Sequence, residues 1–409
     1  MSSKTAGAPG RDTSALKGIQ VVELGMVMQV PLAGQMLGDL GADVIKVERL
    51  PPGEILRTLD PIGFGTGKMS CYYAALCRNK RTLSLDIKSE KGRAALLRLI
   101  DTADVLLHNF RPGVMERLGL DYETLRSRNP RLIYAAGSAF GSEGPMASLP
   151  GQDMLAQSFS GLARSGRDDD APPQLVNSPM IDYLTASSLT QGILAALLER
   201  GRSGEGQMVS TSLFDNALAV QVLETASLAM HRTRTSWIQY SMMFRTSDGW
   251  LCVLTLFRDN PAKGICEAFD QPDISTRAEF ATYRLQVENL AALEDHLSPI
   301  VKTFSTAECV DRLSQQNVLC APINTLEDAL SHQQATTNEA LWEVEIAGYG
   351  PVRLAGNPVK LSRTPPTMRF PPADVGENSV EILSSLGFSD LEIDDLTSSG
   401  LLHVRPTRQ

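Results

Sequence analysis

The feature that most constrains this chain is an alternation of short apolar runs with helical segments, which begins at Gly18. Residues 19–24 and 42–48 have the length and composition of strands, and residues 31–40 between them form a helix candidate punctuated by glycine and proline. Such a strand–helix–strand unit joins parallel strands by a right-handed crossover. The alternation continues with a strand at 81–87, a helix at 89–101 and strands at 104–108 and 131–136. The sequence therefore predicts an α/β domain built on a parallel sheet.

A long helix is predicted over residues 181–200, after a stretch rich in Gly, Pro and Asp at 161–179. Its apolar residues fall on one face at helical spacing, and Gly201 follows as a C-terminal stop. Pro179 keeps the helix from starting further upstream. Asp182 is therefore expected at or near the N-terminus of this helix.

The second half of the chain differs from the first in the length and polarity of its segments. From about residue 226 the segments are shorter and more polar, and Ser-Asp-Gly at 247–249 indicates a turn between two strands. Prolines beyond residue 340 predict an extended arm, followed by a short helical tail from Ser379. The predicted divisions are a flexible tail at 1–17, a large α/β domain at 18–225, a small α+β domain at 226–339, and a C-terminal arm with helices returning to the large domain at 340–409.

Composition excludes several classes of function. The 409 residues carry a formal net charge of -9 without a long run of either sign, which disfavours nucleic acid as a partner. The six cysteines form no C-x-x-C pair, so we expect reduced thiols and no metal site. The N-terminal residues lack the apolar core of a signal peptide, and no segment has the apolar length of a membrane span. The sequence predicts a cytoplasmic protein that does not contact membranes.

Familiar catalytic motifs are missing. The glycines at 63–67 precede Lys68, but their spacing is not that of a phosphate-binding loop. No G-x-G-x-x-G follows the first strand, which disfavours a nicotinamide cofactor. Residues 137–141 place serine one position too early for a nucleophile elbow, and the five histidines are scattered. A serine or cysteine hydrolase is weakly supported.

Three aspartates follow turns and permit two interpretations each. Asp182 near a helix start is either a simple cap or a carboxylate that the helix dipole keeps ionised for nucleophilic attack. Its position alone favours the cap. Asp153 and Asp215 pose the same question, and each is interpreted as a turn or capping residue.

Several segments carry a resemblance to a known family. They are PLAG at 31–34, GDLGADVIKVER at 38–49, NKR at 79–81, LDIK at 85–88, NFRPG at 109–113 and GILAALLERGRSGEGQ at 192–207. In order and spacing these segments resemble the class III CoA-transferases, which include formyl-CoA transferase and the carnitine-type enzymes. The resemblance extends from Gly18 to about Gly400. It implies a Rossmann-like large domain with a mainly parallel sheet, a smaller α+β domain and an interlocked homodimer.

The resemblance also implies an activity and a site. The family's nucleophilic aspartate lies ten residues before the glycine of the GILAAL helix, and the same count from Gly192 reaches Asp182. Asp153 matches a glutamate beside that nucleophile and is assigned an orienting role. The coenzyme A contacts of the family fall on Met28, Gln29, Arg49, Leu85, Lys88, Asn109, Phe110 and Arg117. Arg and Lys suit the phosphates of CoA, and Leu and Phe suit its adenine.

The implied reaction moves CoA from an acyl-CoA donor to a free carboxylic acid through an aspartyl-CoA thioester on Asp182. Acyl-CoA and the acid would be substrates, with no permanently bound cofactor and no metal. An α-methylacyl-CoA racemase is one alternative, although no histidine lies between His108 and His231 to serve as its base. A CoA-binding protein without turnover is the other.

Two departures from the family pattern concern the acid. Gln29 and Val30 stand where the family usually has Ala-Gly before the proline of the first loop. The glycine-rich flap of formyl-CoA transferase has no counterpart between Thr235 and Asp248. We therefore expect an acid larger than oxalate.

Overall fold

The computed structural model describes residues 14–63, 65–164 and 172–405. Residues 1–13 of the predicted tail and residues 165–171 of the stretch at 161–179 lie outside the described part of the chain, as does residue 64. Residues 14–17 do not form a tail, because Leu16 is buried and its backbone N–H donates to Leu40 at 3.0 Å. The described chain divides into two compact units, which comprise residues 14–163, 175–221 and 339–405, and residues 164, 172–174 and 222–338.

The first unit is built on a seven-stranded sheet with the order β12-β3-β2-β1-β4-β5-β6. Its strands are β1 (Gln20–Leu24), β2 (Asp43–Glu48), β3 (Lys80–Leu85), β4 (Val105–His108), β5 (Ile133–Ser138), β6 (Met208–Ser212) and β12 (Leu402–His403). All pairs are parallel except β12 with β3. The order from β3 to β6 is that of a doubly wound dinucleotide-binding sheet, whose switch point lies between β1 and β4. The prediction of a Rossmann-like, mainly parallel sheet is confirmed.

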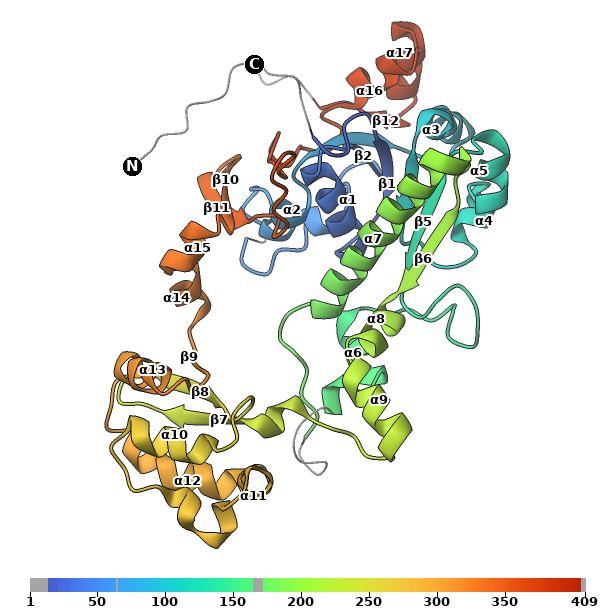
Figure 1. Ribbon diagram of the computed structural model, residues 1–409. Helices are drawn as coiled ribbons and strands as arrows, with labels where there is room; N and C mark the ends of the chain where they lie inside the picture. The colour runs from blue at the N-terminus through green and yellow to red at the C-terminus, as the bar shows by residue number, and fades with distance from the viewer. Residues whose placement is uncertain (1–13, 64, 165–171, 406–409) are drawn as a thin grey trace. The chain divides into compact units, whose positions relative to one another are not determined.

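Helices cover both faces of this sheet (Figure 1). The helices of the first unit are α1 (Gln29–Asp39), α2 (Cys71–Leu76), α3 (Glu90–Thr102), α4 (Val114–Leu118), α5 (Tyr122–Arg128), α6 (Asp153–Phe159), α7 (Met180–Ser203), α8 (Leu213–Ala219), α16 (Ser379–Ser385) and α17 (Asp390–Ser398). One face of the sheet packs on α1 and α7, and the other on α3, α16 and α17. The alternation of side chains along β1 divides the two cores, because Val21 faces the first and Val22 the second.

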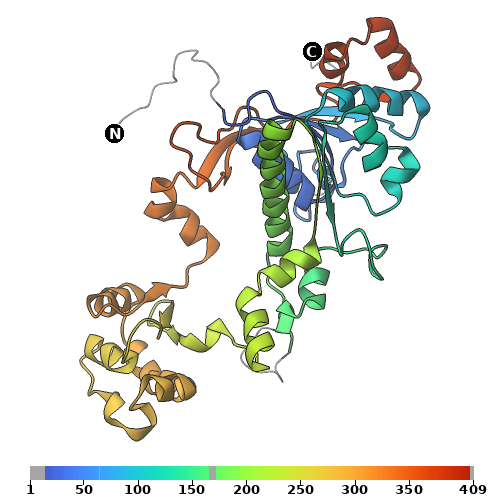
Figure 2. The same cartoon turned by 45° about the vertical axis from the view of Figure 1, so that its right-hand side comes forward.

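Helix α7 is the crossover from β5 to β6, so its N-terminus lies at the edge where the parallel strands end. It lies beside α1 in both views (Figure 1, Figure 2). Among the described helices it alone is long and apolar enough to cross a membrane, but it packs against α1, β5 and β6 as a core helix. The predicted stop at Gly201 is wrong, because the helix continues to Ser203 and Gly204, at φ 80°, ends it.

A layer of buried charge lies between the sheet and α1. Lys46 of β2 and Lys80 of β3 each place Nζ 2.8 Å from a carboxylate oxygen of Glu23 on β1, and all three side chains are fully buried. Burial alone would lower the pKa of Lys46, but Glu23 and neighbouring carboxylates outweigh it and raise the pKa. Helix α1 comes so close that a Cβ at Gly34 would stand 2.0 Å from the Glu23 carboxylate. Glycine at this position permits the helix to cover the ion pairs.

The C-terminal segment does not form a simple extended arm. Strands β10 (Leu341–Ile346) and β11 (Gly350–Ala355) make an antiparallel hairpin before the proline-rich stretch. The chain then adds α16, α17 and β12 to the first unit, where Leu402 pairs with Leu85 of β3. The helical tail predicted from Ser379 coincides with the start of α16.

The second unit has its own core around a three-stranded antiparallel sheet. Its elements are α9 (Val222–His231), β7 (Ser241–Arg245), β8 (Trp250–Leu254), α10 (Pro261–Ala268), α11 (Tyr283–Glu288), α12 (Leu290–Val301), α13 (Thr306–Gln315), β9 (Cys320–Pro322), α14 (Leu326–Ser331) and α15 (Gln333–Thr337). Strands β7 and β8 flank the predicted turn at 247–249. The structure thus has a main, mostly parallel sheet covered by helices, together with smaller antiparallel sheets.

Candidate active site

The loop after β1 and the segment after β4 meet at the switch point of the sheet. Asn109 accepts a hydrogen bond from the Met26 N–H at 3.0 Å and donates one to the Met26 carbonyl at 2.8 Å. Ligands of open α/β sheets bind in the crevice that forms at such a point, outside the carboxyl ends of the strands. Two cavities lie there, and both have Met26 and Phe110 in their walls.

The larger cavity, of about 520 Å³, lies at the ends of β1, β2 and β3. Four of the predicted CoA contacts line it, namely Arg49, Leu85, Lys88 and Phe110. Arg49 and Lys88 are exposed, whereas Leu85 is buried in the wall. The cavity therefore combines cations that water can reach with an apolar floor.

The smaller cavity, of about 290 Å³, contains Asp182. Met28, Gln29, Asn109 and Phe110 of the predicted contacts also line it. Arg117, on α4, is exposed and lines neither cavity. The structure therefore brings the predicted nucleophile together with seven of the eight predicted contacts around two adjoining spaces.

Asp182 lies in the first turn of α7, where Asp153 caps the helix. The N-cap residue Pro179 has no side-chain acceptor, and Asp153 Oδ2 accepts the N–H groups of Ile181 at 2.6 Å and Asp182 at 2.9 Å. Gln157, on the same helix α6 as Asp153, donates to the other oxygen of this carboxylate. Asp153 is only 5 % exposed. Its negative charge therefore stands fixed beside Asp182.

The environment of Asp182 raises its pKa from 3.8 to about 7. Burial is the main cause, and the charge of Asp153 adds to it. The backbone N–H of Gln29, at the start of α1, lies near the Asp182 carboxylate and acts in the opposite direction, toward a lower pKa. The expectation that the helix dipole keeps this carboxylate ionised is thus wrong in direction, because burial and a like charge outweigh the dipole.

The side chain of Gln29 fits against Gly137 because this glycine has no Cβ. Its Oε1 would stand 2.4 Å from a Cβ at Gly137 on β5, and Leu189 of α7 would be 3.2 Å from the same position. This oxygen is buried, and no described group forms a hydrogen bond with it. The departure at residue 29 therefore places a larger side chain in the wall near Asp182, which Gly137 accommodates.

Sequence reasoning missed Glu54, which lines the larger cavity and is 4 % exposed. Its Oε1 accepts the N–H of Val27 in the loop after β1 at 2.9 Å. Glu54 stands in an irregular segment between Pro52 and a short 3₁₀ helix. No pattern marks it, and the only related signal is the recurrence of charged residues within apolar strands, as at Glu23 and Lys46.

Comparison with known proteins decides the family. Residues 16–379 match CoA-transferase family III. The chain belongs to this family. It is 32% identical over 403 residues to an acyl-CoA transferase of Fusarium pseudograminearum, covering 95% of this chain and 88% of that one. It is 30% identical over 389 residues to a probable fatty acyl-CoA transferase of Mycobacterium tuberculosis, covering 90% of this chain and 97% of the relative.

A solved structure agrees with this assignment. The crystal structure of a CaiB/BaiF family protein from Brucella suis superposes with a TM-score of 0.82 at 29% identity, covering 91% of this chain and 99% of the other. This class III CoA-transferase is thus an enzyme that moves CoA between an acyl-CoA and a carboxylate. The resemblance inferred from the sequence is confirmed, and so is the α/β fold with a mainly parallel sheet that it implied.

Proposed function

We propose that this CoA-transferase works through covalent catalysis by Asp182. The observation that carries the proposal is the placement of its carboxylate in the wall of the smaller cavity, in the first turn of a helix and beside Gln29, which lines the same cavity. The larger cavity adjoins it, and Met26 and Phe110 line both spaces. A CoA thioester bound in the larger cavity would therefore direct its acyl end toward Asp182.

The proposed reaction has two chemical steps in each half. An Asp182 oxygen attacks the thioester carbonyl, the C–S bond breaks, and CoA leaves as a thiolate to give a mixed anhydride. The thiolate then attacks the Asp182 carbonyl of the anhydride, which releases the donor's carboxylate and leaves an aspartyl-CoA thioester. The acceptor acid reverses both steps. An acyl bond is conserved throughout, so no nucleotide hydrolysis is needed.

Asp153 and the two helix starts assist this chemistry in the proposal. Asp153 fixes the first turn of α7 and so positions Asp182. The Gln29 N–H at the start of α1 is an orphan donor of that helix and lies near the carboxylate, so it would stabilise the oxyanionic charge that develops when the CoA thiolate attacks the Asp182 carbonyl. CoA itself would be held by Arg49 and Lys88 at its phosphates and by Leu85 and Phe110 at its adenine.

The lining of the smaller cavity supports an acid larger than oxalate. Its side chains include Met26, Met28, Leu149 and Leu213, and its single cationic residue, Arg111, is exposed. A second carboxylate close to Asp182 would therefore lack a buried cation to compensate its charge. We propose an acyl group with a substantial apolar part.

An α-methylacyl-CoA racemase would require a base beside the substrate. No histidine is among the residues that line the two cavities. His108 is buried and packs against Phe110 and Tyr134, and burial lowers its pKa to about 4. These observations favour transfer over racemisation and, together with Asp182, over CoA binding without turnover.

A homodimer is the assembly that we propose. Helix α9 has a largely apolar sequence, yet the described part of the chain buries none of its residues. Val222, Leu223, Leu228 and Met230 of this helix are all exposed. A second copy that covers them would satisfy the expectation of an interlocked dimer, whereas an exposed apolar surface of this kind is rare on monomers. We further propose that the enzyme is cytoplasmic.

Trapping tests the covalent mechanism. Incubation with acyl-CoA followed by hydroxylamine or borohydride is expected to leave a modified Asp182, identified by peptide mass spectrometry, because both intermediates are activated acyl derivatives of its carboxylate. The matched control is Asp215→Asn, which keeps Asp182 and should trap equally well. An unmodified peptide together with exchange of the substrate's α-proton would indicate racemisation instead, and absence of both would indicate binding alone.

The pH dependence of transfer tests the role of Asp153. Because Asp182 must be ionised to attack, kcat/KM is expected to rise with pH through about 7. Asp153→Asn removes the neighbouring negative charge and so lowers the pKa of Asp182. The rising part of the pH profile, its acid limb, should therefore move to lower pH by roughly one pH unit. Asp215→Asn, whose carboxylate does not influence Asp182, should leave the limb in place. An acid limb that remains at the wild-type pH in Asp153→Asn would contradict the role assigned to Asp153.

A further inference from the structure

The loop at residues 25–28 connects the two cavities and has a strained shape. Gly25 and Met26 line the larger cavity, and Met26, Val27 and Met28 line the smaller one. Val27 adopts a φ of 63°, in the left-handed region that β-branched residues strongly avoid. A conformation of this kind is strained and persists only where surrounding contacts enforce it.

Three polar side chains hold three consecutive residues of this loop. Lys46 Nζ donates to the Gly25 carbonyl at 2.8 Å. Asn109 holds both backbone groups of Met26, and Glu54 Oε1 accepts the N–H of Val27 at 2.9 Å. Only the contact from Glu54 falls on the strained residue itself.

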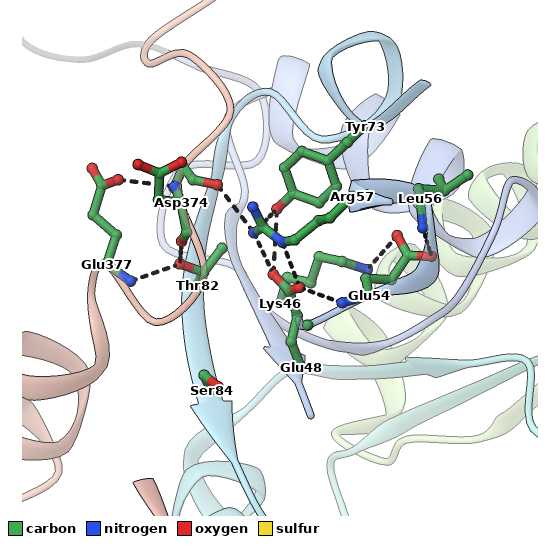
Figure 3. A network of polar contacts seen from close by, with 12 residues as sticks. Lys46, Glu48, Glu54, Leu56, Arg57, Tyr73, Thr82, Ser84, Asp374 and Glu377 are labelled. Carbon is green, nitrogen blue, oxygen red and sulfur yellow. Dashed lines mark hydrogen bonds and ion pairs between the residues drawn. The ribbon is translucent and has the colours of Figure 1, made fainter. Parts of the chain in front are cut away.

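Glu54 is fixed in turn by the buried network shown in Figure 3. Its backbone N–H donates to Glu48 Oε2 at 2.8 Å, and Glu48 pairs with Arg57, which also contacts the Tyr73 hydroxyl. The Glu54 carboxylate lies 3.7 Å from Lys46 Nζ, the same ammonium that holds Gly25. The Glu54 carboxylate is thus held in place by the hydrogen bond of its own backbone N–H and by a buried cation.

The position of the Gln29 N–H depends on this loop. Helix α1 begins at Gln29 directly after it, and Met28 provides no side-chain cap that would anchor the helix start independently. We propose that Glu54 is a positioning residue, which holds Val27 in its left-handed conformation and thereby directs the Gln29 N–H at Asp182. The inference rests on the proposed role of Asp182. It adds Glu54 as a residue that connects the wall of the larger cavity to the proposed nucleophile.

The test compares Glu54→Ala with Glu54→Gln and with Tyr73→Phe. Glu54→Ala removes the acceptor for the Val27 N–H, so kcat is expected to fall about tenfold to a hundredfold, the usual cost of a small misplacement. Loss of the Gln29 contact raises the pKa of Asp182, so the acid limb should move to higher pH, opposite to Asp153→Asn. Glu54→Gln keeps an oxygen that can accept the Val27 N–H. It should therefore retain most of kcat and leave the acid limb near its wild-type pH. Tyr73→Phe weakens the same network without touching the loop and should change neither.

Amide hydrogen exchange of the peptide that spans residues 25–29 gives a readout independent of activity. Faster exchange in Glu54→Ala, but not in Tyr73→Phe, is the expected result. Unchanged exchange, or an unchanged acid limb in Glu54→Ala despite faster exchange, would overturn the positioning role. If the wild-type enzyme showed no covalent adduct on Asp182, the proposed mechanism would fail, while the exchange data would still report whether Glu54 holds the loop.

Discussion

Replacing Asp182 by asparagine is expected to lower kcat for CoA transfer by at least about 10³-fold, because an amide cannot form the anhydride or the thioester. The affinity for CoA should change by no more than about threefold, since Asp182 lines the smaller cavity and not the larger one that the proposal assigns to CoA. The measurements are steady-state transfer assays and titration calorimetry with CoA. Asp215→Asn serves as the matched control and should retain full activity.

The same substitution has a predicted effect on stability, which separates loss of the nucleophile from loss of the fold. The pKa of Asp182 is about 7 in the folded protein and near 3.8 when unfolded, so the folded state binds the extra proton between these pH values. The contribution of this carboxyl to stability is therefore complete below about pH 4 and is lost as pH rises through 7. Asparagine does not titrate, so at pH 8 the variant should be more stable than the wild type by on the order of 2–4 kcal/mol. A variant that is inactive and less stable at pH 8 would contradict this account of the site.

Glu23→Gln is expected to produce the largest loss of stability. It removes the common partner of Lys46 and Lys80, whose ammonium groups are both fully buried. Leaving a buried charge without its partner costs about 3–5 kcal/mol. For a unit of this size that corresponds to a fall in Tm of roughly 6–20 °C, measured by thermal unfolding followed by circular dichroism.

Asp101→Asn is the matched control for Glu23→Gln. Asp101 forms an ion pair with Arg128 at 2.7 Å, but the two side chains are 35% and 41% exposed. Pairs of this kind contribute about 0–1 kcal/mol, because solvent screens them. Equal changes in Tm for the two variants would show that the charge layer beneath α1 does not stabilise the fold as described.

Much of the sheet was predictable, because β1 to β5 overlap the predicted strands at 19–24, 42–48, 81–87, 104–108 and 131–136, and some of its helices begin at recognisable caps. Ser89 precedes α3 and accepts the Gly92 N–H, as the spacing of the sequence suggests. The end of α7 was not predictable in the same way. Gly201 and Gly204 both resemble a stop, and only the left-handed conformation of Gly204 distinguishes them. The pairing of Leu402 with β3 was also hidden, since β12 has only two residues and no strand pattern.

The candidate site was predictable only where the family resemblance supplied it. From its position alone Asp182 reads as a cap, whereas the structure assigns the capping contacts to Asp153, which lies 29 residues earlier in the chain. No local rule connects two carboxylates at that separation. Glu54 was missed because its role depends on a hydrogen bond to Val27 across 27 residues. The sign of the pKa shift at Asp182 also follows from burial, which the sequence does not give.

The central claim is that the Asp182 carboxylate becomes covalently bonded during turnover, and isotope transfer from the acceptor acid tests it most directly. In the proposed sequence an oxygen of the acceptor bridges the anhydride and remains on Asp182 when CoA departs with the acyl group. A single turnover with an acceptor labelled with oxygen-18 in its carboxylate should therefore place one labelled oxygen in the peptide that contains Asp182, and continued turnover should label both carboxylate oxygens, as detected by mass spectrometry. Sustained CoA transfer with no label in that peptide would contradict the mechanism.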